Sequence, residues 1–444
     1  MMEAMGTPTI ETMMDTGAPG ANRGAALLLS VAVGAPDGRR DLDEFAELAA
    51  SAGVDARGLM GARRARPDPR YFIGSGKADE IRQWVGDHDV RLLIVDHDLT
   101  PRQERNLESR IQARVLDRTG LILDIFSQRA QSHEGKLQVE LAQLEYLSTR
   151  LVRGWSHLER QKGGIGLRGP GEKQLETDRR LLRRRMGSVA RQLEGIKRQR
   201  EQRRRRRRKN ALFSIALVGY TNAGKSTLFS ALTGAGVAGE RRLFATLDPL
   251  VRRLELPGGA VLVSDTVGFI RDLPHELVEA FNATLLEVRQ SDLILHVEDA
   301  SDPDCAGHRA QVESVLAAIG ASEIPKINVF NKIDLTGDAP GLLGGNGERA
   351  AAVRLSARSR RGINLLKQAV QDELAPRRRA WQLRVPVAAP ALRAFLYDNG
   401  SVLSERYDPG EGWTLQFELG ERALHRLQKR FGCVAVRARD DLRV

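Results

Sequence analysis

The stretch from Phe213 to Thr227, FSIALVGYTNAGKST, constrains this chain more than any other part of it. A short apolar run leads to Gly219, and the pattern G-x-x-x-x-G-K-S then runs to Ser226. Glycines let the backbone wrap closely around a phosphate group, and the N–H groups at the start of the next helix point at the anion. The stretch therefore predicts a buried strand, a phosphate-binding loop and a helix, in this order.

The side chains of this loop have different expected roles. Lys225 is expected to reach the β- and γ-phosphates, and the Ser226 hydroxyl is expected to coordinate Mg²⁺. An ordinary glycine turn is the alternative, and the strand-to-helix setting argues against it. The other positions predicted to bind nucleotide here are Gly219, Tyr220, Thr221, Asn222, Ala223, Gly224 and Thr227.

Two later segments supply groups that a phosphate loop needs beside it. The tetrapeptide DTVG follows the apolar strand Val261–Ser264, so that Asp265 is expected to hold Mg²⁺ through water and the Gly268 N–H to sense the γ-phosphate. Between the two, LFATLDP offers the Thr246 hydroxyl to close over the ion. The predicted catalytic positions are Lys225, Thr246 and Gly268; the predicted metal ligands are Ser226, Thr246 and Asp265; further predicted nucleotide contacts are Phe244, Ala245, Thr266 and Val267.

The base is predicted from two tetrapeptides further along the chain. NKID follows the strand Lys326–Phe330, and its Asp334 can accept from the N1–H and the 2-amino group of guanine together. Adenine lacks this donor pair. LSAR follows another short strand, and the Ala357 N–H could meet guanine O6. Taken jointly and in this order, the motifs predict GTP, with base contacts from Asn331, Lys332, Asp334, Ser356, Ala357 and Arg358.

One position predicts slow hydrolysis. In Ras-like GTPases a glutamine after the glycine of DxxG orients the attacking water. Phe269 occupies that position here, and phenylalanine cannot hydrogen-bond a water. We therefore expect a low intrinsic rate, with the missing group supplied by a partner or by a rearrangement. Packing of Phe269 against the sheet is compatible with this expectation.

The excess positive charge lies in one segment. The 444 residues carry a formal net charge of +12. From Arg160 to Lys209 there are 20 Lys/Arg and 5 Asp/Glu, a net of +15, so the rest of the chain carries −3. Such a segment favours contact with the phosphate backbone of RNA, and the scarcity of aromatic residues in it favours binding by shape and charge. A solvated face or a linker is the alternative.

Heptad-like apolar spacing surrounds a glycine-rich stretch in the region 131–210. Two long amphipathic helices would bury these seams on each other as an antiparallel hairpin. The joining loop Gly163–Gly171, which contains Arg168, is expected to probe a crevice in RNA; a flexible connector is the alternative. The apolar positions are Leu137, Leu141, Leu144, Leu151, Trp155 and Leu158, then Leu182, Met186, Val189, Leu193 and Ile196.

The whole chain is expected to be a multidomain α/β protein. The expected parts are a disordered tail (1–22), a small α/β domain with a mainly parallel sheet (23–130), the hairpin (131–210), a GTPase domain with helices on both faces of a mainly parallel sheet (211–375), and a small α+β domain (376–444). In the last part, residues 397–407 are expected to be strand-like with a turn at Asn399-Gly400, and residues 421–431 a helix. The turn Gly74–Lys77 either holds an anion or only starts a helix.

The compartment is inferred from what the sequence lacks. No apolar run approaches the ~18 residues of a membrane span. The N-terminal stretch has neither the basic nor the apolar region of a secretory signal. Cys305 and Cys433 lie far apart without metal-type spacing, which favours a reducing, cytoplasmic compartment.

Longer stretches around these motifs resemble the HflX family of ribosome-associated, translation-factor-related GTPases. They include FIGSGKADEI, VLDRTGLILDIFSQRAQSHEGKLQVELAQLEYLSTRL, GGIGLRGPGEKQLETDRR, GYTNAGKSTLF, LFATLDP and DTVGFIRDLPHELVEAF, and they cover most of Arg70 to Asp334. The resemblance implies a bacterial enzyme that uses GTP, GDP and Mg²⁺ and binds the 50S subunit, the 70S ribosome and ribosomal RNA. It also implies that stalled or idle ribosomes are separated into subunits, notably under stress. We expect a monomer.

Three features depart from the family pattern, and two other functions stay open. Leu250 stands where threonine often follows Asp-Pro, Arg358 stands where lysine is common, and the basic run Arg203–Lys209 is unusually long. The first alternative function is a ribosome-assembly GTPase that acts on large-subunit precursors. The second is an RNA-binding or remodelling protein controlled by nucleotide, which could be ATP.

Overall fold

The computed structural model describes residues 23–34, 42–151, 170–209, 213–234, 243–244, 247, 250–257, 259–271, 282–344, 351–374, 378–399, 401–420, 427–428, 430–432 and 436–437. The chain forms two compact units. Unit 1 comprises residues 1–197, 241–248 and 272–282, and unit 2 comprises residues 198–240, 249–271 and 283–444. Among the residues described, none of the helices has both the length and the apolar character needed to cross a membrane.

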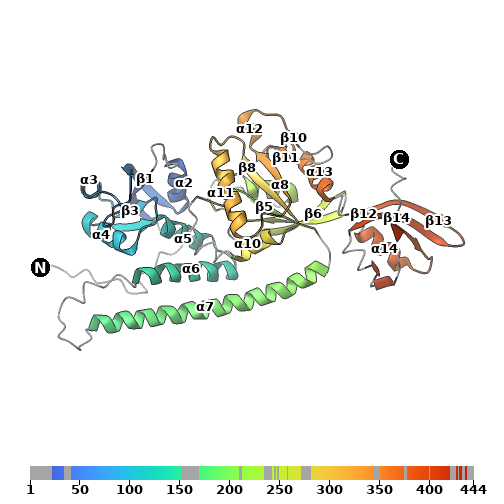
Figure 1. Ribbon diagram of the computed structural model, residues 1–444, viewed down its shortest axis with the longest axis horizontal. Coiled ribbons are helices and arrows are strands. Elements are labelled where there is room, and N and C mark those ends of the chain that lie inside the picture. Colours follow the sequence, from blue (N-terminus) through green and yellow to red (C-terminus); the bar gives the residue numbers. More distant parts are fainter. Residues whose placement is uncertain are drawn as a thin grey trace. The chain divides into compact units, whose positions relative to one another are not determined.

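Unit 1 is built on a four-stranded sheet in the order β2-β1-β3-β4, and all its neighbouring strands are parallel. The elements are β1 (Arg23–Val33), α2 (Leu42–Ser51), β2 (Val54–Arg64), α3 (Ser75–Asp87), β3 (Leu92–Val95), α4 (Pro101–Ile111), β4 (Arg114–Asp117) and α5 (Arg118–Arg129). β1 and β3 are nearly continuous apolar runs because helices cover both faces of such a sheet (Figure 1). The predicted α/β fold of this part is confirmed.

Local signals in unit 1 behave as the sequence indicates. Thr100 caps α4 in a capping box with Gln103, and Pro101 opens the helix. The Gly74–Lys77 turn starts α3, with Gly74 at the N-cap position. Lys77 pairs with Glu80 at 2.7 Å. These contacts show a helix start, and the anion-binding alternative for this turn stays a prediction.

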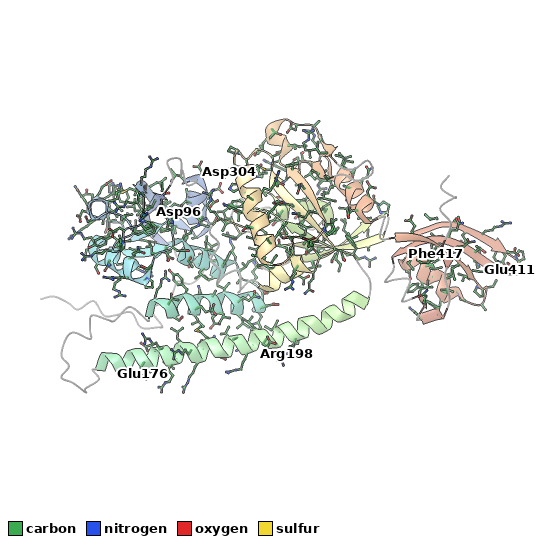
Figure 2. All side chains as sticks on the ribbon, in the orientation of Figure 1. Asp96, Glu176, Arg198, Asp304, Glu411 and Phe417 are labelled. Atoms are coloured by element: carbon green, nitrogen blue, oxygen red, sulfur yellow. The ribbon has the colours of Figure 1, made fainter. Side chains whose placement is uncertain are left out.

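The two long helices α6 (His133–Leu151) and α7 (Pro170–Lys209) pack along each other through the predicted seam (Figures 1 and 2). The side chains buried in that seam are Leu137, Leu144, Leu182, Val189 and Leu193, with Leu141, Met186 and Ile196 packed against them. At the edge of this seam, Arg185 of α7 forms an ion pair with Glu140 of α6. Residues 163–169 of the expected joining loop, Trp155 and Leu158 lie outside the described residues. Pro170 and Gly171, which were expected in the loop, instead begin α7, where proline fits the first turn of a helix.

The main sheet of unit 2 has seven strands in the order β10-β11-β9-β8-β5-β7-β6. β6 pairs antiparallel with β7 and β10 with β11, and the other pairs are parallel. The strands are β5 (Phe213–Val218), β6 (Leu250–Leu256), β7 (Gly259–Asp265), β8 (Leu293–Asp299), β9 (Lys326–Asn331), β10 (Gly341–Leu343) and β11 (Ala352–Arg354), with helices α8 (Lys225–Thr233), α10 (Asn282–Arg289), α11 (Cys305–Ala318), α12 (Ile333–Thr336) and α13 (Ile363–Leu374).

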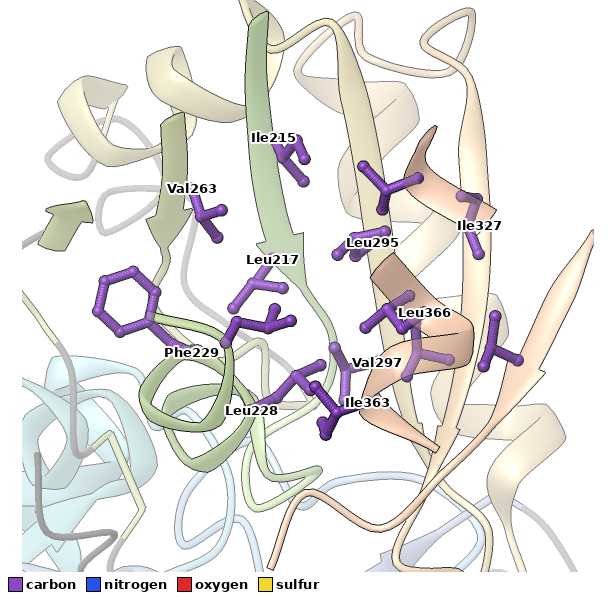
Figure 3. Close-up of a cluster of buried hydrophobic side chains, with 14 of the residues drawn as sticks. Ile215, Leu217, Leu228, Phe229, Val263, Leu295, Val297, Ile327, Ile363 and Leu366 are labelled. Carbon is purple, nitrogen blue, oxygen red and sulfur yellow. The ribbon is translucent and has the colours of Figure 1, made fainter. Parts of the chain in front are cut away.

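Apolar side chains of β5, β7 and β8 form the core of this sheet together with α8 and α13. Figure 3 shows Leu217, Val263 and Val297 of these strands in one buried cluster with Leu228 of α8 and Leu366 of α13. The carboxyl ends of β5, β7, β8 and β9 meet at one edge because these strands are parallel. The loops that carry the predicted motifs therefore gather at that edge.

A second, smaller sheet in unit 2 has the order β13-β14-β12-β15, and its pairs are antiparallel. Its elements are β12 (Arg378–Val385), α14 (Pro390–Asn399), β13 (Ser401–Asp408), β14 (Gly412–Gly420) and β15 (Val436–Arg437). The predicted α+β character of this part is confirmed.

One prediction in this part was wrong. Residues 397–399, expected to be strand-like, form the last turn of α14. Pro390 opens that helix, and the helical spacing of Leu392, Phe395 and Leu396 buries all three against the small sheet. Of the predicted helix over 421–431, residues 427–428 and 430–431 are helical, and the rest lies outside the described residues.

Candidate nucleotide site

The phosphate-binding loop lies between β5 and α8, and its two glycines are sterically required. Gly219 has a φ of +153°, and an added Cβ would lie 2.1 Å from the carbonyl oxygen of Val297. Gly224 has a φ of +93°, and an added Cβ would lie 2.3 Å from Nδ2 of Asn331. A side chain at Gly219 would clash with the backbone of β8, and one at Gly224 would displace the side chain of Asn331. The loop is thus a tight backbone cradle of the kind that accommodates phosphate groups.

Lys225 is held inside this loop. Its Nζ donates to the carbonyl oxygens of Gly219, at 3.0 Å, and of Tyr220, at 2.7 Å. Burial lowers the pKa of Lys225 to about 8, and the nearby carboxylate of Asp265 opposes this shift. The ammonium group is therefore held in place by carbonyl oxygens of the loop itself.

Asp265 and Ser226 carry oxygen atoms of the kind that Mg²⁺ prefers, and both were predicted as its ligands. Asp265 ends β7 and is fully buried, and Ser226 lies in the first turn of α8. Thr266 beside Asp265 donates its hydroxyl to the carbonyl oxygen of Leu217 at 2.6 Å, which fixes β7 against β5. The described residues hold no group of three or more His, Cys, Asp or Glu that could bind a metal ion without nucleotide. One carboxylate and hydroxyl groups fit an ion that also binds phosphate oxygens.

The segment after DTVG packs directly on the phosphate loop. The Thr221 N–H donates to the carbonyl oxygen of Phe269 at 2.7 Å, and the Phe269 N–H donates to that of Gly219 at 3.1 Å. An added Cβ on Gly268 would lie 3.0 Å from Lys225 Nζ, so Gly268 approaches the lysine closely. The Phe269 side chain is only 2% exposed and packs in the protein interior. It is therefore placed as an apolar anchor.

Asn331 joins the two base-recognition motifs to the phosphate loop. Its Nδ2 donates to the carbonyl oxygen of Ala223, and its Oδ1 accepts from the Ala357 N–H, both at 2.9 Å. Lys332 adopts a left-handed φ of +67° and pairs with Asp299 at 2.7 Å. This bridging role was not predicted from the sequence, which assigned Asn331 only to the base.

The remaining predicted base contacts lie beside this bridge. Asp334 lies in the first turn of α12 and is exposed, which leaves its carboxylate accessible to a ligand. Ser356 is fully buried and accepts from the Ser359 N–H at 3.1 Å, which shapes the loop after β11. Arg358 is exposed on that loop. The structure thus brings both motifs to the same edge of the sheet as the phosphate loop.

The LFATLDP segment belongs in part to unit 1. The Leu243 N–H donates to the Ser51 hydroxyl at 3.1 Å. The Phe244 ring meets Phe126 of α5 edge-on, with ring centroids 4.6 Å apart. Phe244 is 3% exposed, so in this structure it contributes to the core of unit 1. Ala245 and Thr246 lie outside the described residues, and their assignment to the nucleotide site stays a prediction.

Three family models match consecutive parts of the chain. Residues 39–127 match the GTP-binding GTPase N-terminal family, and residues 129–207 match the GTP-binding GTPase middle region. Residues 214–332 match a family described as 50S ribosome-binding GTPase. The phosphate loop, Asp265, Asn331 and Lys332 lie within this last match, which ends before Asp334.

Two curated relatives, both named GTPase HflX, align with most of the chain. The relative from Escherichia coli (strain K12) is 49% identical over 381 residues, covering 85% of this chain and 89% of the relative. The relative from Magnetococcus marinus is 44% identical over 393 residues, covering 88% and 90%. Among solved structures, a GTP-binding protein from Sulfolobus solfataricus in complex with GDP is 25% identical, with a TM-score of 0.42 over 80% of this chain and 99% of that chain.

Proposed function

This chain belongs to the HflX family of GTPases, and on that premise we propose that it binds the large ribosomal subunit and splits stalled or idle ribosomes into subunits. As a member of that family it binds guanine nucleotide and hydrolyses GTP. The proposed setting is the cytoplasm, the proposed acting form is a monomer, and the proposed partners are the 50S subunit, the 70S ribosome and their RNA.

The observation that carries the proposal is the basic outer face of α7. The inner face buries Leu182, Val189 and Leu193 against α6. The outer face exposes arginine side chains on one side of the helix, namely Arg180, Arg183, Arg184 and Arg191. A rigid helix that presents a row of guanidinium groups fits the phosphate backbone of folded RNA. A helix that only joins two domains needs no such row.

A second observation supports control of this face by nucleotide. Leu243 and Phe244 pack into the same unit as the hairpin, and Thr246 follows two residues later. We infer that Mg²⁺ binding by Thr246, which the sequence predicts as a ligand, acts on these two contacts. Nucleotide state would then bias the RNA-binding unit through one short segment.

The predicted site residues have different roles in GTP hydrolysis. Lys225 neutralises charge on the phosphates, and the Gly268 N–H donates toward the γ-phosphate. Ser226, Asp265 and Thr246 would hold Mg²⁺, which supplies further charge neutralisation when bound. The buried Phe269 leaves the attacking water without a side-chain partner at that position, and we infer a low intrinsic rate that the ribosome raises.

Sucrose-gradient sedimentation tests the proposed activity. Purified 70S ribosomes are incubated with the protein and GTP, a non-hydrolysable analogue or GDP. We expect free 30S and 50S particles with GTP and with the analogue, and few with GDP. A Lys225→Ala protein, which lacks the phosphate-binding ammonium, should leave the 70S peak intact.

The same gradients separate the two alternative functions. A ribosome-assembly GTPase would leave purified 70S particles intact and would change the abundance of large-subunit precursors in cells that lack the protein. An RNA-remodelling protein would leave both unchanged. Intact 70S particles in every nucleotide state would overturn the splitting proposal.

A further inference from the structure

The hydroxyl of Tyr220 joins the phosphate loop to the segment that follows DTVG. It accepts a hydrogen bond from the Arg271 N–H at 2.9 Å. Next to it, Phe269 forms a parallel bridge with Tyr220, with backbone hydrogen bonds to the residues on either side of the tyrosine. Hydrogen bonds from both the backbone and a side chain of the loop thus hold the segment Phe269–Arg271.

The Tyr220 ring is itself held in place from α11. It stacks on the imidazole of His308, with ring centroids 3.8 Å apart and an interplanar angle of 22°. The His308 Nδ1 is 2.5 Å from a carboxylate oxygen of Asp302. Tyr220 is 9% exposed, so its ring has little freedom to choose another orientation. The direction of the hydroxyl therefore depends on His308 and Asp302.

Arg271, which donates to the Tyr220 hydroxyl, also contacts the loop that precedes α11. The guanidinium group of Arg271 lies 3.6 Å from the Asp304 carboxylate. The Asp304 N–H donates to Asp302 at 2.9 Å. The loop before α11 thus contacts both the partner of Tyr220 and the residue that Tyr220 binds. This closed set of contacts relates the phosphate loop, the DTVG segment and α11 to one another.

We propose that Tyr220 is a positioning residue for GTP hydrolysis, whose hydroxyl, oriented by His308 and Asp302, holds the segment Phe269–Arg271 on the phosphate loop. Gly268 directly precedes this segment and comes so close to Lys225 that an added Cβ would lie 3.0 Å from Nζ. A shift of the segment therefore moves the Gly268 N–H relative to the lysine. Since Phe269 cannot orient the attacking water, the rate of hydrolysis should depend more strongly on the position of the backbone groups in this segment.

A steady-state assay of the full-length protein without ribosomes tests this role. Tyr220→Phe removes only the hydroxyl. We expect kcat to fall about three- to tenfold, the effect of one neutral hydrogen bond, with KM for GTP and Kd for GDP within about twofold. Tyr397→Phe is the matched control, because it removes a tyrosine hydroxyl that donates to Glu405 at 2.9 Å in the small sheet. It should leave kcat unchanged.

The role of His308 is tested by coupling. His308→Ala should lower kcat, and the double variant with Tyr220→Phe should be no slower than the slower single variant, because both changes release the same hydroxyl. Additive losses would overturn the role assigned to His308. An unchanged kcat in Tyr220→Phe, or an equal loss of GDP affinity, would overturn the proposal itself. The assay contains no ribosomes, so it is independent of the proposed splitting activity.

Discussion

Asn331 shows how one buried side chain organises a site that three distant segments share. Its amide group contacts the phosphate loop at Ala223 and the last motif at Ala357. Both partners are backbone groups, so the contact does not depend on their side chains. The sequence motif identifies the residue, but only the fold shows that it also sets the distance between the phosphate-binding and base-binding parts.

Lys225 predicts opposite pH dependences for folding and for binding. Burial lowers its pKa to about 8 from 10.5, so between these pH values the unfolded chain binds more protons at this residue than the folded protein. Its contribution to the free energy of unfolding of the nucleotide-free protein should therefore rise with pH from about 8 to 10.5. Phosphate favours the charged form, so GDP affinity should be level below pH 8 and fall above it. Fluorescent-nucleotide titrations from about pH 7 to 9 measure the second effect.

The matched control is Lys225→Gln, which has no titrating group at this position. It should bind GDP weakly and should lose the part of the pH dependence that comes from the lysine. Equal pH profiles for the two proteins would contradict the assignment.

Asp334 predicts a change of base preference. Its carboxylate is exposed at the start of α12, where it can accept two hydrogen bonds from guanine. Asp334→Asn replaces one acceptor by a donor, which fits the 2-oxo group of xanthine. We expect GTP hydrolysis to fall by at least about a hundredfold, because the paired hydrogen bonds to guanine are removed, and xanthosine triphosphate to become the better substrate. An unchanged preference for GTP would favour the RNA-remodelling alternative.

At the scale of elements, the amphipathic helix α7 separates its two faces by function. Val189 is fully buried toward α6, whereas Arg183, Arg184 and Arg191 are exposed. Stability of the hairpin therefore depends on one face, and the proposed RNA contact depends on the other. Charge changes on the outer face should leave the fold intact.

The variant Arg183→Glu, Arg184→Glu, Arg191→Glu tests the outer face. We expect weaker binding to 50S subunits and a shallower dependence of log K on log salt, by about 0.7–0.9 for each phosphate group that the helix no longer neutralises. GDP affinity should not change. The control reverses three exposed arginines outside this face, Arg252, Arg289 and Arg406. If both triple variants bind equally well, the outer face of α7 does not contact the subunit.

The elements differ in how far the sequence alone predicts them. β5 and the phosphate loop are predictable because glycine, lysine and serine at fixed spacing permit few structures. The seam of α6 and α7 is predictable because the heptad-like spacing repeats over a long stretch of sequence. α14 was missed because Asn399-Gly400 favours a turn, whereas the burial of Leu392 and Phe395, which makes the segment helical, depends on the distant small sheet. The helical conformation of α14 therefore depends on packing against residues far away in the sequence.

The same limit applies within the site. The motifs predict Lys225, Asp265 and Asp334 as site residues because each has a characteristic side chain at a characteristic spacing. Contacts between Tyr220 and Arg271, or between Phe244 and Phe126, carry no such spacing. The apolar pair Leu243-Phe244 beside a predicted Mg²⁺ ligand is the one signal that could have suggested a partner outside the nucleotide site.

At the scale of the whole molecule, the central claim is that the nucleotide site and the RNA-binding unit act together. Residues 241–248 belong to unit 1, which carries most of the hairpin, although the chain on either side of them belongs to unit 2. Leu243 and Phe244 are each 3% exposed there. Binding of RNA by that unit should therefore alter hydrolysis at the phosphate loop.

The most direct test is GTP turnover by the purified protein alone, with 50S subunits and with 70S ribosomes. The arginine-reversed α7 variant is measured beside the native protein under the same conditions. We predict slow turnover alone and strong stimulation by 50S or 70S particles, with most of the stimulation lost in the variant and its basal rate kept. The claim would be contradicted if ribosomes did not change the turnover of the native protein. It would also be contradicted if the variant were stimulated by ribosomes as strongly as the native protein.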